Sequence, residues 1–296
     1  MRDPHVARGR PLVSVLTPSF GQARWLEDNV RSVEAQTYAS IEHVVMDGGS
    51  TDGSVRILEN RSRDGLIWAS KPDQGQSDAI NRAHERSSGE IIGWLNSDDA
   101  YFTRNVVTEA VRVFENHPDV GVVYGHAALV NGAGTLLHVL WAPPYVPALL
   151  RWYNFIFQPT VFVRRSVLGR ADFVNPAFDY MMDWELWLHL SARTRFRRLD
   201  QIMAIDRHHL QRKSYTRLDL AVHDRESLLQ RYRPPRAASN RLVVKGVKLG
   251  FRLAGLSKVA EAARGSDGLA IDVPSVGTIA FRQVAQLRRW MPSGDG

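Results

Sequence analysis

The sequence predicts an α/β fold in which a mostly parallel sheet is flanked by helices. Apolar runs with strand composition alternate with amphipathic helical stretches four times between residues 12 and 115, and the connections are short. Such alternation is typical of doubly wound parallel sheets with right-handed crossovers. The length of 296 residues also suits one large α/β domain, or one domain with an appendage.

The four strand–helix units follow from apolar spacing and turn residues. Each strand candidate is an apolar run that closes on Gly, Pro, Asn or Asp. These candidates are residues 12–17, 41–46, 66–70 and 91–95. Each is followed by a stretch with helical apolar spacing or a helix-capping residue. The candidate helices are residues 23–36, 51–60, 76–87 and 106–115.

Beyond residue 120 the alternation weakens. A strand from Val120 to Tyr124 leads into a hairpin over residues 124–142 that turns between Asn131 and Gly134. Spacing and composition predict three later elements. They are a helix at 182–190, a strand at 196–205 and a helix at 219–232.

Pro234 and Pro235 mark a boundary before the C-terminal part of the chain. Beyond them, helical spacing gathers basic residues on one face and leucines on another. The basic residues are Arg241, Lys245, Lys248 and Arg252, and the leucines are Leu242, Leu249, Leu253 and Leu256. The pattern favours a packing helix with a solvated basic face slightly over a helix at a membrane surface or partner. Residues 265–296 are rich in Gly and Ser, which is compatible with loose order.

The stretch from Ile91 to Asp99 carries the main chemical signal. Its apolar strand ends abruptly at Asn96-Ser-Asp-Asp99. Adjacent carboxylates at the end of a buried strand repel each other and lose hydration unless a positive group lies between them. Mg²⁺ and Mn²⁺ prefer such oxygen ligands. Capping of the helix expected after Thr103 explains Asp98 and Asp99 equally well.

Polar loops also follow other strands of the predicted sheet. Asp47 follows the second strand, and residues 73–78 follow the third. Because the carboxyl ends of parallel strands share one edge of a sheet, these loops and Asp98 are expected to form one site.

Composition narrows the function classes. The formal net charge of +7 suits anionic partners such as nucleotides, nucleic acid or an anionic membrane face. Nucleic-acid binding is disfavoured because no basic run is interleaved with aromatic residues. A Rossmann dehydrogenase is disfavoured because the first strand lacks a following Gly-x-Gly-x-x-Gly. The absence of cysteine excludes disulfides and thiolate zinc sites.

The chain shows no targeting or membrane-spanning pattern. Residues 1–10 lack the apolar centre of a signal peptide, and no run reaches the ~18 apolar residues of a membrane span. We expect a cytoplasmic protein, with the basic segment 241–256 as a candidate contact with the inner face of the membrane.

Five stretches, in order, resemble the family 2 glycosyltransferases, an inverting group with the GT-A fold. They match that family's first strand, base-contacting Asp loop, loop and helix over the nucleotide, DxD-type metal motif and catalytic Asp segment. The stretches are residues 13–21, 44–54, 70–81, 95–99 and 182–187. One departure is Asn96, which stands at the first acidic position of the metal motif.

The resemblance covers about residues 11–216 and implies a Rossmann-like GT-A domain. Its first half, residues 11–117, would bind the nucleotide, and its second half, residues 118–216, the acceptor. Residues 217–296 would form a C-terminal helical extension.

The resemblance also implies a set of donor-binding residues. Asp47 would contact the N–H of the base, or simply form the turn before Gly48. Pro18 and Phe20 would wall the base pocket. The loop over the nucleotide supplies Asp73 and Gly75, with Asp78 as a weaker candidate.

A divalent cation, Mg²⁺ or Mn²⁺, is part of the same expectation. Asp98 would ligate it across the donor diphosphate, where the ion stabilises the leaving group. Asp99 would ligate through water or contact the sugar hydroxyls.

The candidate general base is Asp183. It matches the family position and lies in the first turn of an expected helix, where the macrodipole favours the ionised form. Glu185 lies roughly 200° around the helix, so the two cannot share one site. The residues alone do not choose between them.

A cationic segment from Arg207 to Lys213 completes the candidates. In related folds a late histidine completes the metal site or holds the diphosphate, which makes His208 a donor-binding and His209 a metal-binding candidate. Arg212 suits a diphosphate. A solvated basic loop explains this segment equally well.

The expected function is therefore that of a hexosyltransferase-like, inverting glycosyltransferase. It would move a sugar from a nucleotide-diphosphate donor, UDP or dTDP rather than GDP, to an acceptor hydroxyl. A glycan or lipid-linked acceptor and a role in cell-surface glycan or glycolipid biosynthesis follow from the family. The alternatives are a nucleotidyltransferase and an inactive nucleotide-sugar-binding protein.

Overall fold

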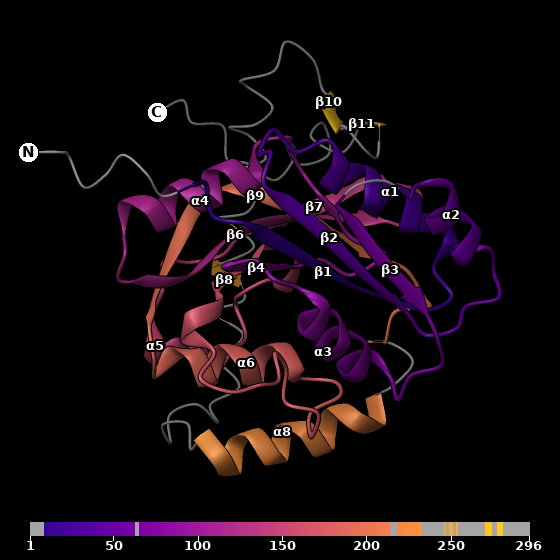
Figure 1. Ribbon diagram of the computed structural model, residues 1–296. Coiled ribbons are helices and arrows are strands. Elements are labelled where there is room, and N and C mark those ends of the chain that lie inside the picture. The colour runs from indigo at the N-terminus through magenta and orange to yellow at the C-terminus, as the bar shows by residue number, and fades with distance from the viewer. Residues whose placement is uncertain are drawn as a thin grey trace, which may run out of the picture.

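A nine-stranded sheet forms the centre of the fold (Figure 1). The computed structural model describes residues 9–62, 65–213 and 218–232, with short pieces at 246, 249–250, 253, 270–273 and 277–280. Within these residues the strand order is β3-β2-β1-β4-β8-β6-β9-β5, and β7 pairs with β6. The strands are β1 Val13–Ser19, β2 Ile41–Asp47, β3 Leu66–Ser70, β4 Ile91–Trp94, β5 Ala100–Tyr101, β6 Val120–Asn131, β7 Leu136–Leu140, β8 Phe162–Arg164 and β9 Arg195–His208.

The N-terminal half is the predicted parallel α/β unit. β1 lies between β2 and β4 and pairs with both in parallel, with Val13 opposite Ile41 and Ser19 opposite Asp47. β3 extends this arrangement in parallel on the other side of β2. All seven residues of β1 are buried, the polar Ser14, Thr17 and Ser19 included, as expected for a central strand that is covered on both faces.

Helices cover both faces of this half. Alternate residues of β1 point to opposite sides, so Val13 and Val15 pack toward α1 and α4 while Leu16 packs toward α3. Figure 1 shows α3, α6 and α8 below the sheet. The helices are α1 Ala23–Glu34, α2 Ser54–Asn60, α3 Gln76–Arg86, α4 Val106–Asn116, α5 Pro147–Leu150, α6 Met182–Ser191 and α8 Leu218–Tyr232, with 3₁₀ turns η1 Gln158–Thr160 and η2 Arg165–Val167.

The second half joins the sheet through antiparallel pairs. β8 lies antiparallel between β4 and β6, and the short β5 pairs antiparallel with the end of β9. The hairpin of β6 and β7 is confirmed, because Gly134 N–H donates to Asn131 O at 2.9 Å. β6 and β9 are longer than the sequence predicted, since they pair in parallel along much of their length. The sheet is therefore mostly parallel in its first half and mixed in its second.

The C-terminal part is described only in pieces. The helix predicted at 219–232 is present as α8. The basic segment 241–256 and the Gly- and Ser-rich end lie largely outside the described residues. A short antiparallel pair, β10 Ala270–Val273 and β11 Gly277–Ala280, was not predicted. Among the described residues, no helix is both long and apolar enough to cross a membrane.

Candidate active site

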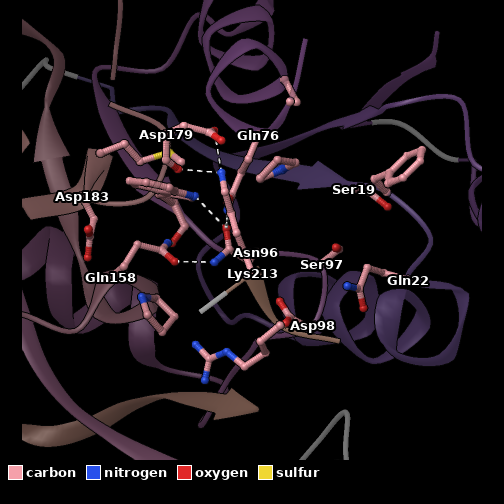
Figure 2. Close-up of a pocket in the computed structure, with 18 of the residues that line it drawn as sticks. Ser19, Gln22, Gln76, Asn96, Ser97, Asp98, Gln158, Asp179, Asp183 and Lys213 are labelled. Carbon is pink, nitrogen blue, oxygen red and sulfur yellow. Dashed lines mark hydrogen bonds and ion pairs between the residues drawn. The ribbon is translucent and has the colours of Figure 1, made fainter. Parts of the chain in front are cut away.

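A cavity of about 760 Å³ lies at the carboxyl ends of β1, β2 and β4 (Figure 2). This is the edge of the sheet where the sequence placed the site. Seven of the residues chosen from the sequence line the cavity. They are Pro18, Phe20, Asp73, Gly75, Asp98, Asp183 and Arg212. The remaining candidates do not line the cavity. They are Asp47, Asp78, Asp99, His208 and His209.

Asp47 organises the loop that follows β2. Its carboxylate accepts hydrogen bonds from Gly49 N–H at 3.1 Å, Ser50 N–H at 2.8 Å, Ser50 Oγ at 2.6 Å and Ser70 Oγ at 2.6 Å. These contacts are those of the turn-forming role. The contact with a base that the resemblance implies stays a prediction.

The loop of Asp73 closes tightly over the end of β2. Asp73 Oδ1 accepts Gly75 N–H at 2.9 Å, and Gly75 adopts φ +110° at the start of α3. A Cβ atom on Gly48 would lie 2.7 Å from Asp73 Oδ2 and 3.1 Å from the Phe20 ring, so a larger residue there would displace the Asp73 carboxylate. Phe20 is 69% exposed at the cavity wall, where a flat aromatic ring can stack on a ligand.

Asp78 supports this loop from outside the cavity. Its Oδ2 accepts Gln74 N–H at 2.9 Å and pairs with Arg82 Nη2 at 2.8 Å. Its observed contacts are thus with the loop and with its own helix.

The acidic turn after β4 is held by α1. Asn29 Nδ2 donates to Asn96 O at 2.8 Å and to Asp99 O at 3.1 Å, so one amide group brackets the turn. The capping alternative for Asp98 and Asp99 is not what the structure has, because α4 begins at Val106 without a side-chain cap.

Asp99 is buried beneath Asp98. It is 2% exposed, and its Oδ1 accepts Arg207 N–H at 3.1 Å. Burial, reinforced by the charges of Asp98 and Asp206, raises the pKa of Asp99 well above its ordinary value. Asp99 therefore ties the end of β9 to the acidic turn, and its raised pKa shows that the charged form is disfavoured beside Asp98 and Asp206.

Asp206 is a cavity residue that the sequence analysis missed. β5 pairs with β9 so that Ala100 lies opposite Ile205, which brings Asp206 beside the acidic turn. Arg212 Nη1 pairs with Asp206 Oδ1 at 2.6 Å. Burial works against the charge of Arg212, but Asp206, Asp99 and Asp98 outweigh it and raise its pKa. A fixed cation therefore faces the cavity beside the carboxylates.

Two further basic residues bind the acidic turn. His209 Nε2 lies 2.9 Å from Asp98 Oδ2, and its ring packs on Trp25 with centroids 3.9 Å apart. Its buried Nδ1 has no hydrogen-bond partner among the described residues. Arg207, 2% exposed, donates to Asp98 O at 2.9 Å and to Asp28 Oδ2 at 3.0 Å. His208 ends β9 opposite Asn131 and does not line the cavity.

The donor set suits a hard divalent cation. Asp98 and Asp206 supply carboxylate oxygens at the cavity, and His209 supports Asp98 from behind. Within the described part of the chain, no three such groups already converge on one point. A cation here would accordingly complete its shell with ligand phosphates and water, as Mg²⁺ commonly does.

Asp183 lies in the first turn of α6 and faces the cavity (Figure 2). Its carboxylate accepts Asn154 Nδ2 at 2.9 Å and Trp184 N–H at 2.7 Å. Burial raises the pKa of Asp183 above its ordinary value, and the two hydrogen bonds offset this only in part. A raised pKa makes the carboxylate a better proton acceptor.

Glu185, the competing carboxylate, is fully buried on the other side of α6. It pairs with Arg170 at 3.0 Å and accepts Tyr232 Oη–H at 2.9 Å. Trp184 is a core residue whose Nε1–H donates to Leu150 O at 2.7 Å. The structure thus separates two acids that the sequence alone left equivalent.

Comparison with known proteins decides the family. The profile described as "Glycosyl transferase family 2" matches residues 14–175, more than half of the chain. The chain belongs to glycosyl transferase family 2. An uncharacterized glycosyltransferase of Mycobacterium tuberculosis H37Rv is 38% identical over 116 residues, which are 39% of this chain and 44% of that protein.

Other curated relatives share longer stretches at lower identity. An uncharacterized glycosyltransferase of Nostoc is 32% identical over 187 residues, 59% of this chain and 56% of that protein. A PGL/p-HBAD biosynthesis glycosyltransferase of Mycobacterium bovis BCG is 25% identical over 178 residues, 59% of this chain and 68% of that protein. The chain spans about half the length of the first two relatives.

Solved structures identify the fold as GT-A. Residues 1–349 of TarS from S. aureus superpose with a TM-score of 0.56 at 21% identity, over 66% of this chain and 60% of that one. The mannosyltransferase PcManGT from Pyrobaculum calidifontis, solved with GDP-Man and Mn²⁺, has a TM-score of 0.56 at 19% identity, over 95% of this chain and 80% of that one. The predicted fold class is confirmed.

The bracketing of the acidic turn by Asn29 gives a stability prediction. Asn29→Asp keeps the side-chain shape but replaces the donating Nδ2 atom with an oxygen that faces the carbonyl oxygens of Asn96 and Asp99. We expect the free energy of unfolding to fall by about 1–3 kcal/mol, the usual range for leaving buried polar groups unsatisfied. Urea denaturation measures it. Asn60→Asp, at the exposed end of α2, is the matched control, and equal effects of the two changes would contradict this role of Asn29.

Proposed function

We propose that the protein is an inverting glycosyltransferase that moves a sugar from a nucleotide-diphosphate donor to an acceptor hydroxyl. The observation that carries this proposal is that Asp98 and Asp183 line one cavity in a family 2 chain. The first is suited to holding a divalent cation against the leaving group and the second to removing a proton. Both are needed for a direct displacement at the anomeric carbon.

The donor would lie along the carboxyl ends of β1, β2 and β4. Pro18 and Phe20 would wall the base, Asp47 would accept its N–H, and the loop of Asp73 and Gly75 would close over the nucleotide. Asp78 would act through that loop. UDP or dTDP is the preferred donor class from the Asp47 match. One neighbouring TarS structure was solved with UDP-GlcNAc, whereas PcManGT was solved with GDP-Man.

A divalent cation, Mg²⁺ or Mn²⁺, would be held by Asp98. When bound it supplies Lewis-acid stabilisation of charge on the departing diphosphate. His209 would orient Asp98, and Asp99 would act through water from below. Arg212 would hold a phosphate oxygen, since a guanidinium forms directed hydrogen bonds with phosphate. His208 is the least supported donor-binding candidate, because it does not line the cavity.

Asp183 would act as the general base. Its carboxylate would take the proton of the acceptor hydroxyl while that oxygen bonds to the anomeric carbon and the bond to the diphosphate breaks on the opposite face. Asn154 fixes the carboxylate by donating to one of its oxygens. The other oxygen is oriented by the N–H of Trp184 at the start of α6.

The acceptor would enter beside residues 154–159, in the second half of the domain. A glycan or lipid-linked acceptor in cell-surface biosynthesis fits the naming of the mycobacterial PGL/p-HBAD relative. A peripheral membrane contact through residues 241–256 belongs to the same proposal and lies largely outside the described residues.

Ligand-dependent stabilisation tests the donor site. UDP-, dTDP- and GDP-sugars should each be titrated with and without Mn²⁺ in a thermal-shift assay. A donor at a hundredfold excess over its Kd stabilises the folded state by ~2.7 kcal/mol. We expect a metal-dependent shift with one nucleotide that Asp98→Ala abolishes and Asp119→Ala, on the exposed turn before β6, retains. No shift with any donor above millimolar concentration would contradict the donor site.

Removal of the base tests the chemistry. Asp183→Asn should lower kcat by ~10²–10⁴-fold, the usual contribution of a general base. Donor affinity should stay within a few fold, because Asp183 is assigned to the acceptor. Asp172→Asn, exposed in the loop before α6, controls for the change in net charge. Wild-type turnover in Asp183→Asn with intact donor binding would contradict the role of Asp183 as the general base.

The pH dependence follows from the pKa of the same carboxyl group. Only the ionised form accepts a proton, and burial raises the pKa of Asp183. The acid limb of the kcat/KM profile should therefore lie at higher pH than an ordinary aspartate gives, with activity falling as pH decreases through that raised pKa. The pH profile of the residual activity of Asp183→Asn should lack this acid limb. If the acid limb is unchanged by the substitution, a group other than Asp183 is responsible for it.

A further inference from the structure

Three side-chain amides from separate segments meet in the wall of the cavity (Figure 2). Asn96 Oδ1 accepts Nε2–H of Gln76 and Nε1–H of Trp94, each at 3.0 Å. Asn96 Nδ2 donates to Gln158 Oε1 at 2.6 Å. Gln158 Nε2 donates in turn to Trp94 O at 2.6 Å. The hydrogen-bonded chain therefore begins and ends on Trp94.

Trp94 fixes the orientation of every amide in this chain. The indole N–H can only donate and the backbone carbonyl can only accept. The atom of Asn96 that faces the indole must therefore be oxygen, so its nitrogen faces Gln158. The atom of Gln158 that faces Asn96 must then be oxygen, so its nitrogen faces Trp94 O. Turning Gln158 over creates two mismatched contacts, and turning Asn96 over creates three, because its oxygen also accepts from Gln76.

The Asn96 oxygen is the atom that would ligate a metal at this position of the motif, and it already accepts two hydrogen bonds. We propose that Asn96 is a positioning residue and not a metal ligand. Together with Trp94 it holds Gln76 and Gln158 so that their remaining N–H groups face the cavity and hydrogen-bond hydroxyl groups of the transferred sugar. The sugar contact rests on the proposed transferase function, whereas the fixed orientation of the amides does not.

This arrangement explains why an acidic residue at position 96 is unfavourable here. A carboxylate would keep the bonds from Trp94 and Gln76 but would place oxygen against Gln158 Oε1. Turning Gln158 over relieves that contact and places its oxygen against Trp94 O. One acceptor–acceptor contact remains in either case, and such contacts are costly where they are partly shielded from water.

A double-mutant cycle tests the fixed orientation without any substrate. Asn96→Asp alone and Gln158→Lys alone should each lower Tm, on the order of 5 °C. The combined variant should recover most of the loss, because an ammonium group donates both to the new carboxylate and to Trp94 O. Asn175→Asp is the matched control, since Asn175 Oδ1 only accepts Ala177 N–H at 3.1 Å and a carboxylate can do the same. Asn175→Asp should leave Tm unchanged.

The affinity for Mn²⁺ and the KM for the nucleotide-sugar give a second test. We expect Asn96→Asp to bind Mn²⁺ in the presence of UDP no more tightly than wild type, as measured by electron paramagnetic resonance. Asn96→Ala should raise KM for the nucleotide-sugar at least tenfold while the Kd of UDP alone stays within twofold. Tighter Mn²⁺ binding by Asn96→Asp with unchanged Tm, or a double variant no more stable than the single variants, would overturn the proposal. An inactive wild type with the expected Tm cycle would overturn only the proposed function.

Discussion

The site depends on neutralising three carboxylates at the junction of the two halves of the sheet. Asp98, Asp99 and Asp206 come together because the short β5 pairs with the end of β9. Buried like charges are unfavourable without close partners. Arg212, which faces the cavity, pairs with Asp206 and lies close enough to Asp99 to favour its charged form. The backbone N–H of Arg207 donates to Asp99, while the Arg207 side chain donates to Asp98 O and pairs with Asp28. The pairing that assembles the negative charge thus also supplies its compensation.

A second constraint keeps the cavity wall next to this charge neutral. The amide chain anchored on Trp94 uses its polar groups on one another in a single orientation. These three amides thereby add no charge to the wall beside Asp98. Asp183 lies on α6, and its raised pKa comes from burial and not from a neighbouring acid. The carboxylates of Asp98 and Asp183 therefore lie in different electrostatic surroundings within one cavity.

Local sequence signals were sufficient to predict the candidate site residues that directly follow a single strand. Apolar runs and turn residues predict where β1, β2 and β4 end. Parallel pairing then brings those ends to one edge of the sheet. Asp98 and Asp183 could be chosen on that basis together with the family resemblance. Asp206 could not, because the pairing that brings it beside the acidic turn joins Ala100 to Ile205, two residues far apart in the sequence. A carboxylate just before the cationic stretch Arg207 to Lys213 was the only local hint.

Apolar spacing and turn residues were enough to predict the α/β class, the position of the candidate site at one sheet edge and the residues of the main motifs. Periodicity and turn chemistry are local properties, so one chain suffices to read them. Tertiary structure alone decided that Asp183 faces the cavity while Glu185 pairs with Arg170, and that the Asn96 oxygen is occupied. It also decided that β6 and β9 extend along each other. These outcomes depend on which distant groups share a buried space, and hydrogen-bond partners and desolvation exist only once that space has formed.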